Sequence, residues 1–189
     1  HGLYIEDDCY DNIINNSFIS TNATGTSYGI YIQTDKTNTT IYNTNITAIS
    51  TEIYVGSDQD PGSYLKLYNC TWNESNASIN DADFTLFNYN YLKANVTSNL
   101  GSALDGAAVT AYNATGTAWT DTTAASGLTE WNPVLEFYQN STGKYVLANY
   151  TVNATLSGYL ENTTTVNASI NRLVNLTLTS EIRYISSCQ

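Results

Sequence analysis

The sequence predicts an all-β protein whose two halves follow different patterns. Hydrophobic residues make up 42% of the 189 residues, so the chain can bury a core. Sixteen Tyr, no Met and many Val, Ile and Thr favour pleated, half-buried strands, and no segment has sustained helical periodicity. Residues 1–90 repeat a short strand pattern, whereas residues 91–178 alternate apolar and polar side chains along successive short strands.

The repeat in the first half begins with three copies of one strand, at Leu3–Ile5, Ile30–Ile32 and Ile53–Val55. Alternation places the outer two residues of each copy on one face and the central tyrosine on the other. A second pattern follows each copy: an apolar residue, any residue, an asparagine, any two residues and a second apolar residue. It reads Ile13-Asn15-Phe18, Ile41-Asn43-Ile46 and Leu67-Asn69-Trp72, with a weaker fourth copy at Leu86-Asn88-Tyr91.

These repeats resemble those of right-handed parallel β-helix proteins. In that family each coil stacks on the last at about 4.8 Å, and inward asparagines at a turn form a hydrogen-bonded ladder. The resemblance implies a short right-handed parallel β-helix over residues 1–90, with a buried asparagine ladder of Asn15, Asn43 and Asn69. It implies little about activity, because β-helices include lyases, hydrolases, adhesins and inert spacers.

The second half, residues 91–178, is predicted to be an antiparallel β-sandwich. Leu92, Ala94 and Val96 alternate with polar residues, as do Val174 and Leu176 later in the chain. This half resembles the carboxypeptidase-regulatory-like, Ig-like modules of prokaryotic surface proteins, which act as spacers or adhesive domains. The matching residues are Leu92-Lys93-Ala94-Asn95-Val96, residues 106–113, Ser126-Gly127-Leu128-Thr129, and Tyr150-Thr151-Val152-Asn153-Ala154 leading to Ser157-Gly158-Tyr159.

The C-terminal segment, residues 179–189, resembles one more coil strand, because aligning Cys188 on Cys9 places Ile182 on Leu3. An odd count of three cysteines suggests a bridge between chains or a free thiol. Stacked coil positions lie about 5 Å apart, which suits a disulfide. We therefore predict a Cys9–Cys188 disulfide, within one chain or between chains, and a buried free thiol at Cys70.

The charge of the chain excludes several partners. A net charge of −11 with six basic residues argues against nucleic acid and against anionic membrane surfaces. The sequence contains no run of about 20 apolar residues, so membrane insertion is not predicted. The chain begins at His1 rather than Met, and we expect a processed chain.

No catalytic site is predicted, and we expect the protein not to be an enzyme. The single histidine is His1, so no nucleophile with a histidine base can be assigned. The cysteines lack the spacing of zinc ligands, and no cofactor is predicted. Calcium binding remains an alternative at two acidic clusters, Glu6-Asp7-Asp8 with Asp11, and Asp58 with Asp60, although neither follows a known loop signature.

The three tryptophans are interpreted as core or interface anchors, with a sugar-stacking platform as the alternative: Trp72, Trp119 and Trp131.

Fifteen Asn-x-Ser/Thr sequons occur among 189 residues, against about six expected from the composition. A sequon marks an asparagine that a secreted protein can offer to a glycan. Asn15 and Asn69 are expected to stay bare, because a buried ladder amide cannot carry sugar. The thirteen predicted glycosylation sites are Asn22, Asn38, Asn45, Asn73, Asn76, Asn95, Asn113, Asn140, Asn149, Asn153, Asn162, Asn167 and Asn175.

Together, the repeats, the Ig-like half and the sequons resemble an archaeal-type surface glycoprotein. The expected function is that of a non-enzymatic, heavily N-glycosylated structural subunit of an extracellular filament, sheath or S-layer at the cell surface. The open ends of a coil stack expose strand edges, so we expect the chain to assemble with itself, head to tail, through β-strand and β-helix end contacts. The alternative is a cell-surface adhesin or carbohydrate-binding module.

Overall fold

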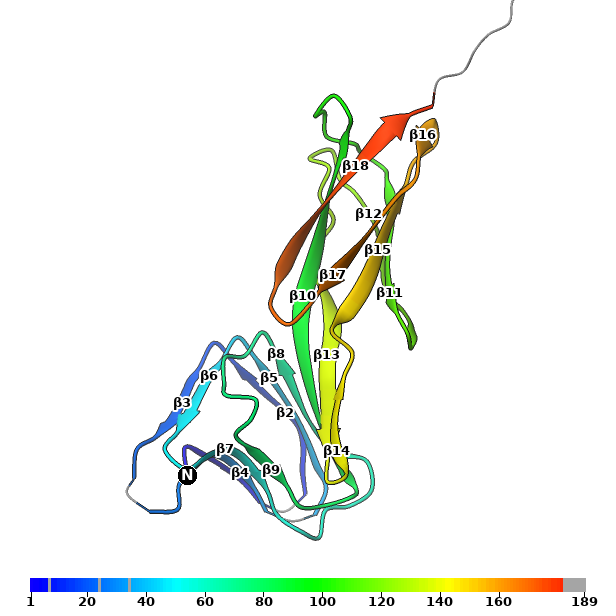
Figure 1. Ribbon diagram of the computed structural model, residues 1–189. Coiled ribbons are helices and arrows are strands. Elements are labelled where there is room, and N and C mark those ends of the chain that lie inside the picture. Colours follow the sequence, from blue (N-terminus) through cyan, green and yellow to red (C-terminus); the bar gives the residue numbers. More distant parts are fainter. Residues whose placement is uncertain (7, 24, 34, 182–189) are drawn as a thin grey trace, which may run out of the picture. The chain divides into compact units, whose positions relative to one another are not determined.

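The computed structural model describes residues 1–6, 8–23, 25–33 and 35–181, and its regular elements are β-strands, as predicted (Figure 1). The chain divides into two compact units. Unit 1 contains His1–Asn90 with Leu135–Val146, and unit 2 contains Tyr91–Val134 with Leu147 onwards. The strands are β1 (Leu3–Ile5), β2 (Cys9–Asn15), β3 (Phe18–Thr21), β4 (Tyr28–Ile32), β5 (Thr37–Tyr42), β6 (Asn45–Ala48), β7 (Thr51–Val55), β8 (Ser63–Tyr68), β9 (Ala77–Ile79), β10 (Phe84–Ser98), β11 (Ala108–Asn113), β12 (Gly116–Thr122), β13 (Asn132–Asn140), β14 (Gly143–Val146), β15 (Asn149–Thr155), β16 (Tyr159–Leu160), β17 (Asn162–Asn167) and β18 (Arg172–Ser180).

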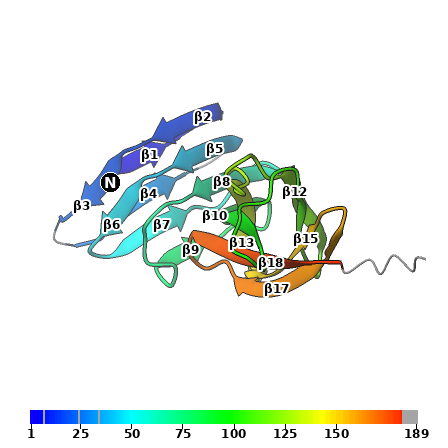
Figure 2. The same ribbon diagram turned by 90° about the horizontal axis from the view of Figure 1, so that it is seen from above.

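Residues 1–90 of unit 1 form parallel strands that stack coil upon coil (Figure 2), and we call them the coil stack. One sheet has the order β1-β4-β7-β9, a second contains β2, β5, β8 and β10 in register, and β3 pairs with β6. All of these pairings are parallel. The three predicted strand copies are paired directly, since Leu3 lies opposite Ile30 and Ile30 opposite Ile53.

Alternation along the strands separates the core of the coil stack from its outer face. Ile32 and Val55 occupy equivalent positions in successive coils and are fully buried. Burying one such side chain contributes about 1.5–3 kcal/mol. The intervening tyrosines lie outside. Tyr4 and Tyr31 stack with ring centroids 5.3 Å apart, and Tyr31 and Tyr54 lie 5.2 Å apart with tilted rings.

The asparagine positions differ from the prediction by one residue in the first coil. Asn15 pairs with Tyr42, so the residue equivalent to Asn43 is Asn16. The pairing of β2 with β5 changes register between Cys9 and Asn12, so Ile14, rather than Ile13, lies opposite Ile41. The equivalent turn residues Asn16, Asn43 and Asn69 have φ values of 49°, 47° and 51°, a left-handed conformation that asparagine tolerates better than most residues.

The fourth asparagine copy was also placed incorrectly. Tyr68 pairs with Tyr89, and the main-chain N–H of Asn69 donates to the carbonyl of Tyr89. The residue that follows the pattern of Asn69 is therefore Asn90 and not the predicted Asn88. The strand does not end there, because β10 continues to Ser98.

The hairpin formed by Leu135–Val146 belongs to unit 1, although the sequence analysis places these residues in the second domain. β13 pairs with β10 and with β14, so the hairpin extends the sheet beyond the last coil. Phe137 is fully buried in the same cluster as the coil core. Its large apolar side chain covers the last coil, which explains why the segment packs there.

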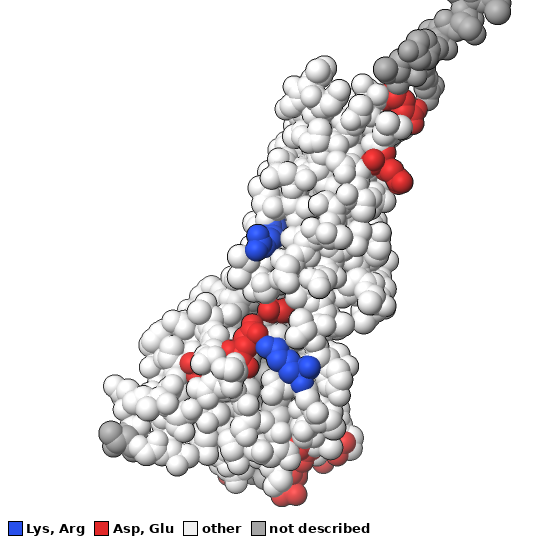
Figure 3. Space-filling model, viewed as in Figure 1, with Lys and Arg blue, Asp and Glu red and all other residues white. Residues whose placement is uncertain are grey.

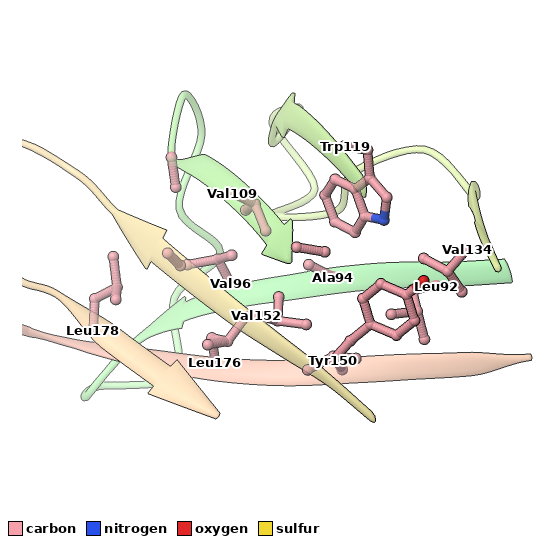
Figure 4. Close-up of a cluster of buried hydrophobic side chains, with 14 of the residues drawn as sticks. Leu92, Ala94, Val96, Val109, Trp119, Val134, Tyr150, Val152, Leu176 and Leu178 are labelled. Carbon is pink, nitrogen blue, oxygen red and sulfur yellow. The ribbon is translucent and has the colours of Figure 1, made fainter. Parts of the chain in front are cut away.

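Unit 2 is a β-sandwich. One sheet, β12-β11-β15-β17, is antiparallel throughout. The other contains β10 and β18, whose parallel pairing differs from the antiparallel strands predicted for this half. Side chains from both sheets fill one core, including Val96, Val152 and Leu176 (Figure 4). The apolar face predicted for residues 92–96 is buried as expected.

The C-terminal segment was predicted to resemble a coil strand. Residues 182–189, including Cys188, lie outside the described residues. The predicted strand and the Cys9–Cys188 disulfide therefore stay predictions. The last described strand, β18, ends at Ser180.

Candidate functional site

The first coil presents strand edges that the described part of the chain leaves unpaired. β1 and β2 end their sheets, and β3 pairs only with β6 among the described strands. Each edge offers main-chain N–H and C=O groups to a further strand, because a parallel ladder uses both sides of every interior strand. We call this surface, with the side chains it exposes, the first-coil end.

Apolar side chains at the first-coil end are only partly covered. Leu3, Cys9 and Ile14 pack against the coil core but remain half-exposed, whereas the equivalent Ile30 and Ile41 of the next coil are fully buried. Phe18, further along the coil, is 67% exposed. One additional strand would bury apolar surface of the kind that each later coil already buries.

At the opposite end of the coil stack the β13–β14 hairpin covers the edge of β10, whereas β9 ends the other sheet among the described strands. A buried carboxylate lies beneath the hairpin. Glu136 is 5% exposed and accepts hydrogen bonds from the side-chain amides of Asn88 and Asn90, both at 2.8 Å. The indole N–H of Trp72 donates to the Asn88 side-chain oxygen at 3.2 Å, which fixes that amide in turn.

This environment changes the acidity of Glu136. Burial, and secondarily the charge of Glu74, raises the pKa of Glu136 from 4.5 to about 7, although the hydrogen bonds from the amides and the charge of Lys144 act in the opposite direction. Lys144 also forms an ion pair with Glu74 at 2.6 Å. The hairpin therefore contains an acid that titrates near neutral pH.

The two described cysteines do not bond to one another. The Cys9 thiol lies at the first-coil end and donates to the carbonyl of Glu6 at 3.0 Å. Burial raises the pKa of the Cys70 thiol, which disfavours the reactive thiolate. Both thiols are half-buried, so Cys70 is not buried as predicted, and Cys9 is the one at the first-coil end, where the predicted Cys188 would lie.

The predicted ladder asparagines are hydrogen bonded but exposed. The side-chain N–H of Asn43 donates to the side-chain oxygen of Asn15 at 3.3 Å, and that of Asn69 donates to the oxygen of Asn43 at 2.8 Å. All three side chains lie on the outside of the turn rather than in the core. The premise that Asn15 and Asn69 are buried is therefore wrong, and whether they carry sugar stays a prediction.

Every sequon asparagine reaches the surface at least in part. Asn22, Asn45, Asn73, Asn149, Asn167 and Asn175 are exposed, and Asn38, Asn76, Asn95, Asn113, Asn140, Asn153 and Asn162 are half-buried. In unit 2, some of these residues pair across strands, since the Asn95 amide donates to Asn175 at 3.0 Å and the Asn167 amide to Asn149 at 3.3 Å. Glycan attachment itself stays a prediction.

The acidic residues form no metal centre in the described part of the chain, where no three His, Cys, Asp or Glu side chains converge. Asp58 and Asp60 lie in the turn before β8, and Asp7 of the other cluster lies outside the described residues. Basic side chains are few on the face drawn in Figure 3. No helix of the described residues has the length and apolarity to cross a membrane.

The tryptophans do not form a shared platform. Trp119 is 9% exposed in the core of unit 2, and Trp131 is 46% exposed with the Lys93 ammonium 5.9 Å from its ring centroid. Trp72 packs near Phe137 in unit 1, with ring centroids 6.2 Å apart. The outer tyrosines, which the sequence analysis placed on one face, stack on each other and so occupy one another's ring faces.

Comparisons with known proteins give weak likenesses. The sequence matches no protein-family model and no curated protein. Its structure is similar to the Bacillus anthracis TIE protein, with 14% identity and a TM-score of 0.35 over 51% of this chain and 17% of that one. It is also similar to GBS52, the minor pilin of Streptococcus agalactiae, with 13% identity and a TM-score of 0.36 over 58% of this chain and 53% of that one. Similarity at this level carries no argument about function.

Proposed function

We propose that the chain is a non-enzymatic, heavily N-glycosylated structural subunit of an extracellular filament, sheath or S-layer at the cell surface, of the archaeal type that its sequence resembles. The observation that carries the proposal is the first-coil end. It has three strand edges that the described residues leave unpaired, and half-exposed Leu3, Cys9 and Ile14, whereas the β13–β14 hairpin covers the edge of β10 at the other end of the stack.

The difference between the two ends defines how copies join. The first-coil end accepts a strand, and the segment that supplies it is the part of residues 179–189 of another copy that follows β18, whose sequence aligns with the first coil. In that alignment Cys188 lies beside Cys9, at a spacing that a disulfide spans. Because the donating and accepting surfaces differ, each added copy leaves the same pair of surfaces open, and a filament grows.

The sequons support an extracellular location. All fifteen asparagines are at least partly exposed, so folding leaves room for glycans on both units. A hydrophilic sugar layer on the outer faces also limits lateral association through the other sheet edges. The alternative function, an adhesin or carbohydrate-binding module, is supported by an uncharged groove in the coil stack, whose lining includes Phe18, Asn43 and Asn69.

The test is the oligomeric state of the full chain and of a chain shortened to residues 1–181, by light scattering and electron microscopy. We expect polymers from the full chain and monomers from the shortened chain, and a synthetic peptide of residues 179–189 should shorten the polymers. Equal melting temperatures would show that the shortened chain folds. Polymers of equal length from both chains would refute the proposed contact.

A further inference from the structure

A groove of about 510 Å³ lies over the turn that joins β2, β5 and β8 to the sheet of β3 and β6. Its lining comes from three successive coils, so equivalent residues recur along it. The exposed side chains of the lining include Phe18, Asn43, Asn45, Asn69 and Thr71.

One row of outward side chains crosses these coils. Phe18 pairs with Asn45, and Asn45 forms a bridge with Thr71, and all three side chains are exposed. At about 4.8 Å per coil, the row spans about 10 Å and presents an aromatic ring, an amide and a hydroxyl in turn. A ligand lying along the row would meet an apolar surface first and hydrogen-bonding groups beyond it.

A second row consists of the turn asparagines. The Asn43 amide is held between Asn15 and Asn69 by the two side-chain hydrogen bonds, at 3.3 Å and 2.8 Å. An amide has two N–H donors and an oxygen with two lone pairs, so Asn43 keeps one donor and one acceptor for a ligand after both bonds are made. Its orientation is fixed before a ligand arrives, which lowers the entropy lost on binding.

The groove contains no charged side chain among its lining residues. A phosphate, carboxylate or metal ion would find no opposite charge there. An apolar peptide would cover amides and hydroxyls without replacing their hydrogen bonds to water, which is unfavourable. A ligand with many neutral hydroxyls and an apolar C–H face satisfies both the ring and the amides.

We propose that this groove binds a neutral oligosaccharide. The C–H face of one sugar ring stacks on Phe18, and hydroxyls of the same or the next sugar bond to Asn43 and Thr71. Two sources fit this chemistry, namely a glycan carried by the protein itself and a polysaccharide of another surface. No residue of the C-terminal segment takes part in sugar binding, although β3, which carries Phe18, is also an edge of the first-coil end.

The test uses the chain of residues 1–181, which the proposed assembly leaves monomeric, made in a bacterial host, which leaves Asn45 and Asn69 without glycan. The ¹⁵N-labelled protein is titrated with neutral trisaccharides of glucose, mannose and N-acetylglucosamine, with glycans released from the native protein, and with trigalacturonate as a charged probe. We expect a neutral probe to shift the side-chain amide signals of Asn43 and Asn45, and Phe18→Ala to weaken this binding by at least about tenfold.

Tyr112→Ala is the matched control, because it removes an aromatic ring that is 40% exposed in unit 2, outside the groove. It should bind like the parent chain, and all variants should melt at the same temperature. Binding of the released glycans alone would assign the groove to the protein's own sugars, and binding of the free trisaccharides to a foreign polysaccharide. Absence of binding by every neutral probe, or unchanged binding by Phe18→Ala, would overturn the proposal, while the oligomerisation test would stand unaffected.

Discussion

Glu136→Gln is predicted to stabilise the protein at neutral and alkaline pH. The carboxylate oxygen of Glu136 accepts from Asn88 and Asn90 at 2.8 Å each, and the glutamine amide has an oxygen that can accept from the same donors. The substitution keeps the size of the side chain and removes its charge. Any change in stability therefore reports the cost of holding that charge beneath the β13–β14 hairpin.

The magnitude follows from the acidity of the group. Burial raises the pKa of Glu136 from 4.5 to about 7, a difference of about 2.5 pH units, or about 3 kcal/mol at 1.36 kcal/mol per unit. Because the folded protein holds the proton more tightly, this group stabilises the fold fully below pH 4.5. That contribution is lost as the pH rises through about 7. Glu136→Gln should remove this dependence and raise the free energy of unfolding at pH 8 by up to about 3 kcal/mol.

The assay is urea denaturation of both proteins between pH 4 and pH 8.5, followed by circular dichroism. Glu161→Gln, at an exposed position in unit 2, is the control, and its pH dependence should match that of the parent chain. Equal stability of the parent and the variant at pH 4, with a widening difference toward pH 8, is the expected result. A variant that keeps the full pH dependence of the parent chain would refute the reasoning.

Three further predictions concern the coil stack. Ile41→Ala removes a fully buried side chain and should lower the free energy of unfolding by about 2–5 kcal/mol. Ile13 is 72% exposed, so Ile13→Ala should change it by less than about 0.5 kcal/mol. Equal effects of the two substitutions in urea denaturation would contradict the register. Gly29→Ala should cost about 1–3 kcal/mol, because its Cβ would lie 2.7 Å from a main-chain oxygen of the next coil; a variant as stable as the parent would disprove this close approach. Glycopeptide mass spectrometry of the native protein should find sugar on Asn15 and Asn69, since both are exposed; bare asparagines at both sites, beside occupied neighbours, would count against this.

The parallel coils could be predicted because their signal is local and repeated. Leu3, Ile30 and Ile53 begin the same three-residue strand in successive coils, and the structure pairs them in that order. The alternation of Leu92, Ala94 and Val96 likewise predicted which face of β10 is buried. In both cases the side-chain period of two residues determines the face without knowledge of distant contacts.

The register of the first asparagine could not be read from the sequence, because Ile13-Asn15-Phe18 and Ile14-Asn16-Ile19 fit the same pattern. The choice depends on the irregularity between Cys9 and Asn12, which shifts the strand by one residue. A one-residue slip exchanges the two faces of a strand. The left-handed turn at Asn16 is the local signal that distinguishes the alternatives once the backbone is known.

The covering hairpin was missed for a different reason. Leu135–Val146 lies within the second half of the sequence and carries no copy of the coil repeat. Its association with the coil stack depends on Phe137 and on the pairing of β13 with β10, which are contacts between distant parts of the chain. Glu136 could have been singled out only as an acid between apolar neighbours, Leu135 and Phe137, in a predicted strand.

The most direct test of the proposed assembly is to locate the disulfide partners of Cys9 in polymers grown from an equal mixture of ¹⁴N- and ¹⁵N-labelled full chains. Non-reducing digestion and mass spectrometry identify both the linked cysteines and the chains they come from. The account predicts Cys9 linked to Cys188 in peptides of mixed label, because one copy donates its C-terminal segment to the first-coil end of the next. Cys9–Cys188 peptides of uniform label only, or Cys9 linked to Cys70, would contradict it.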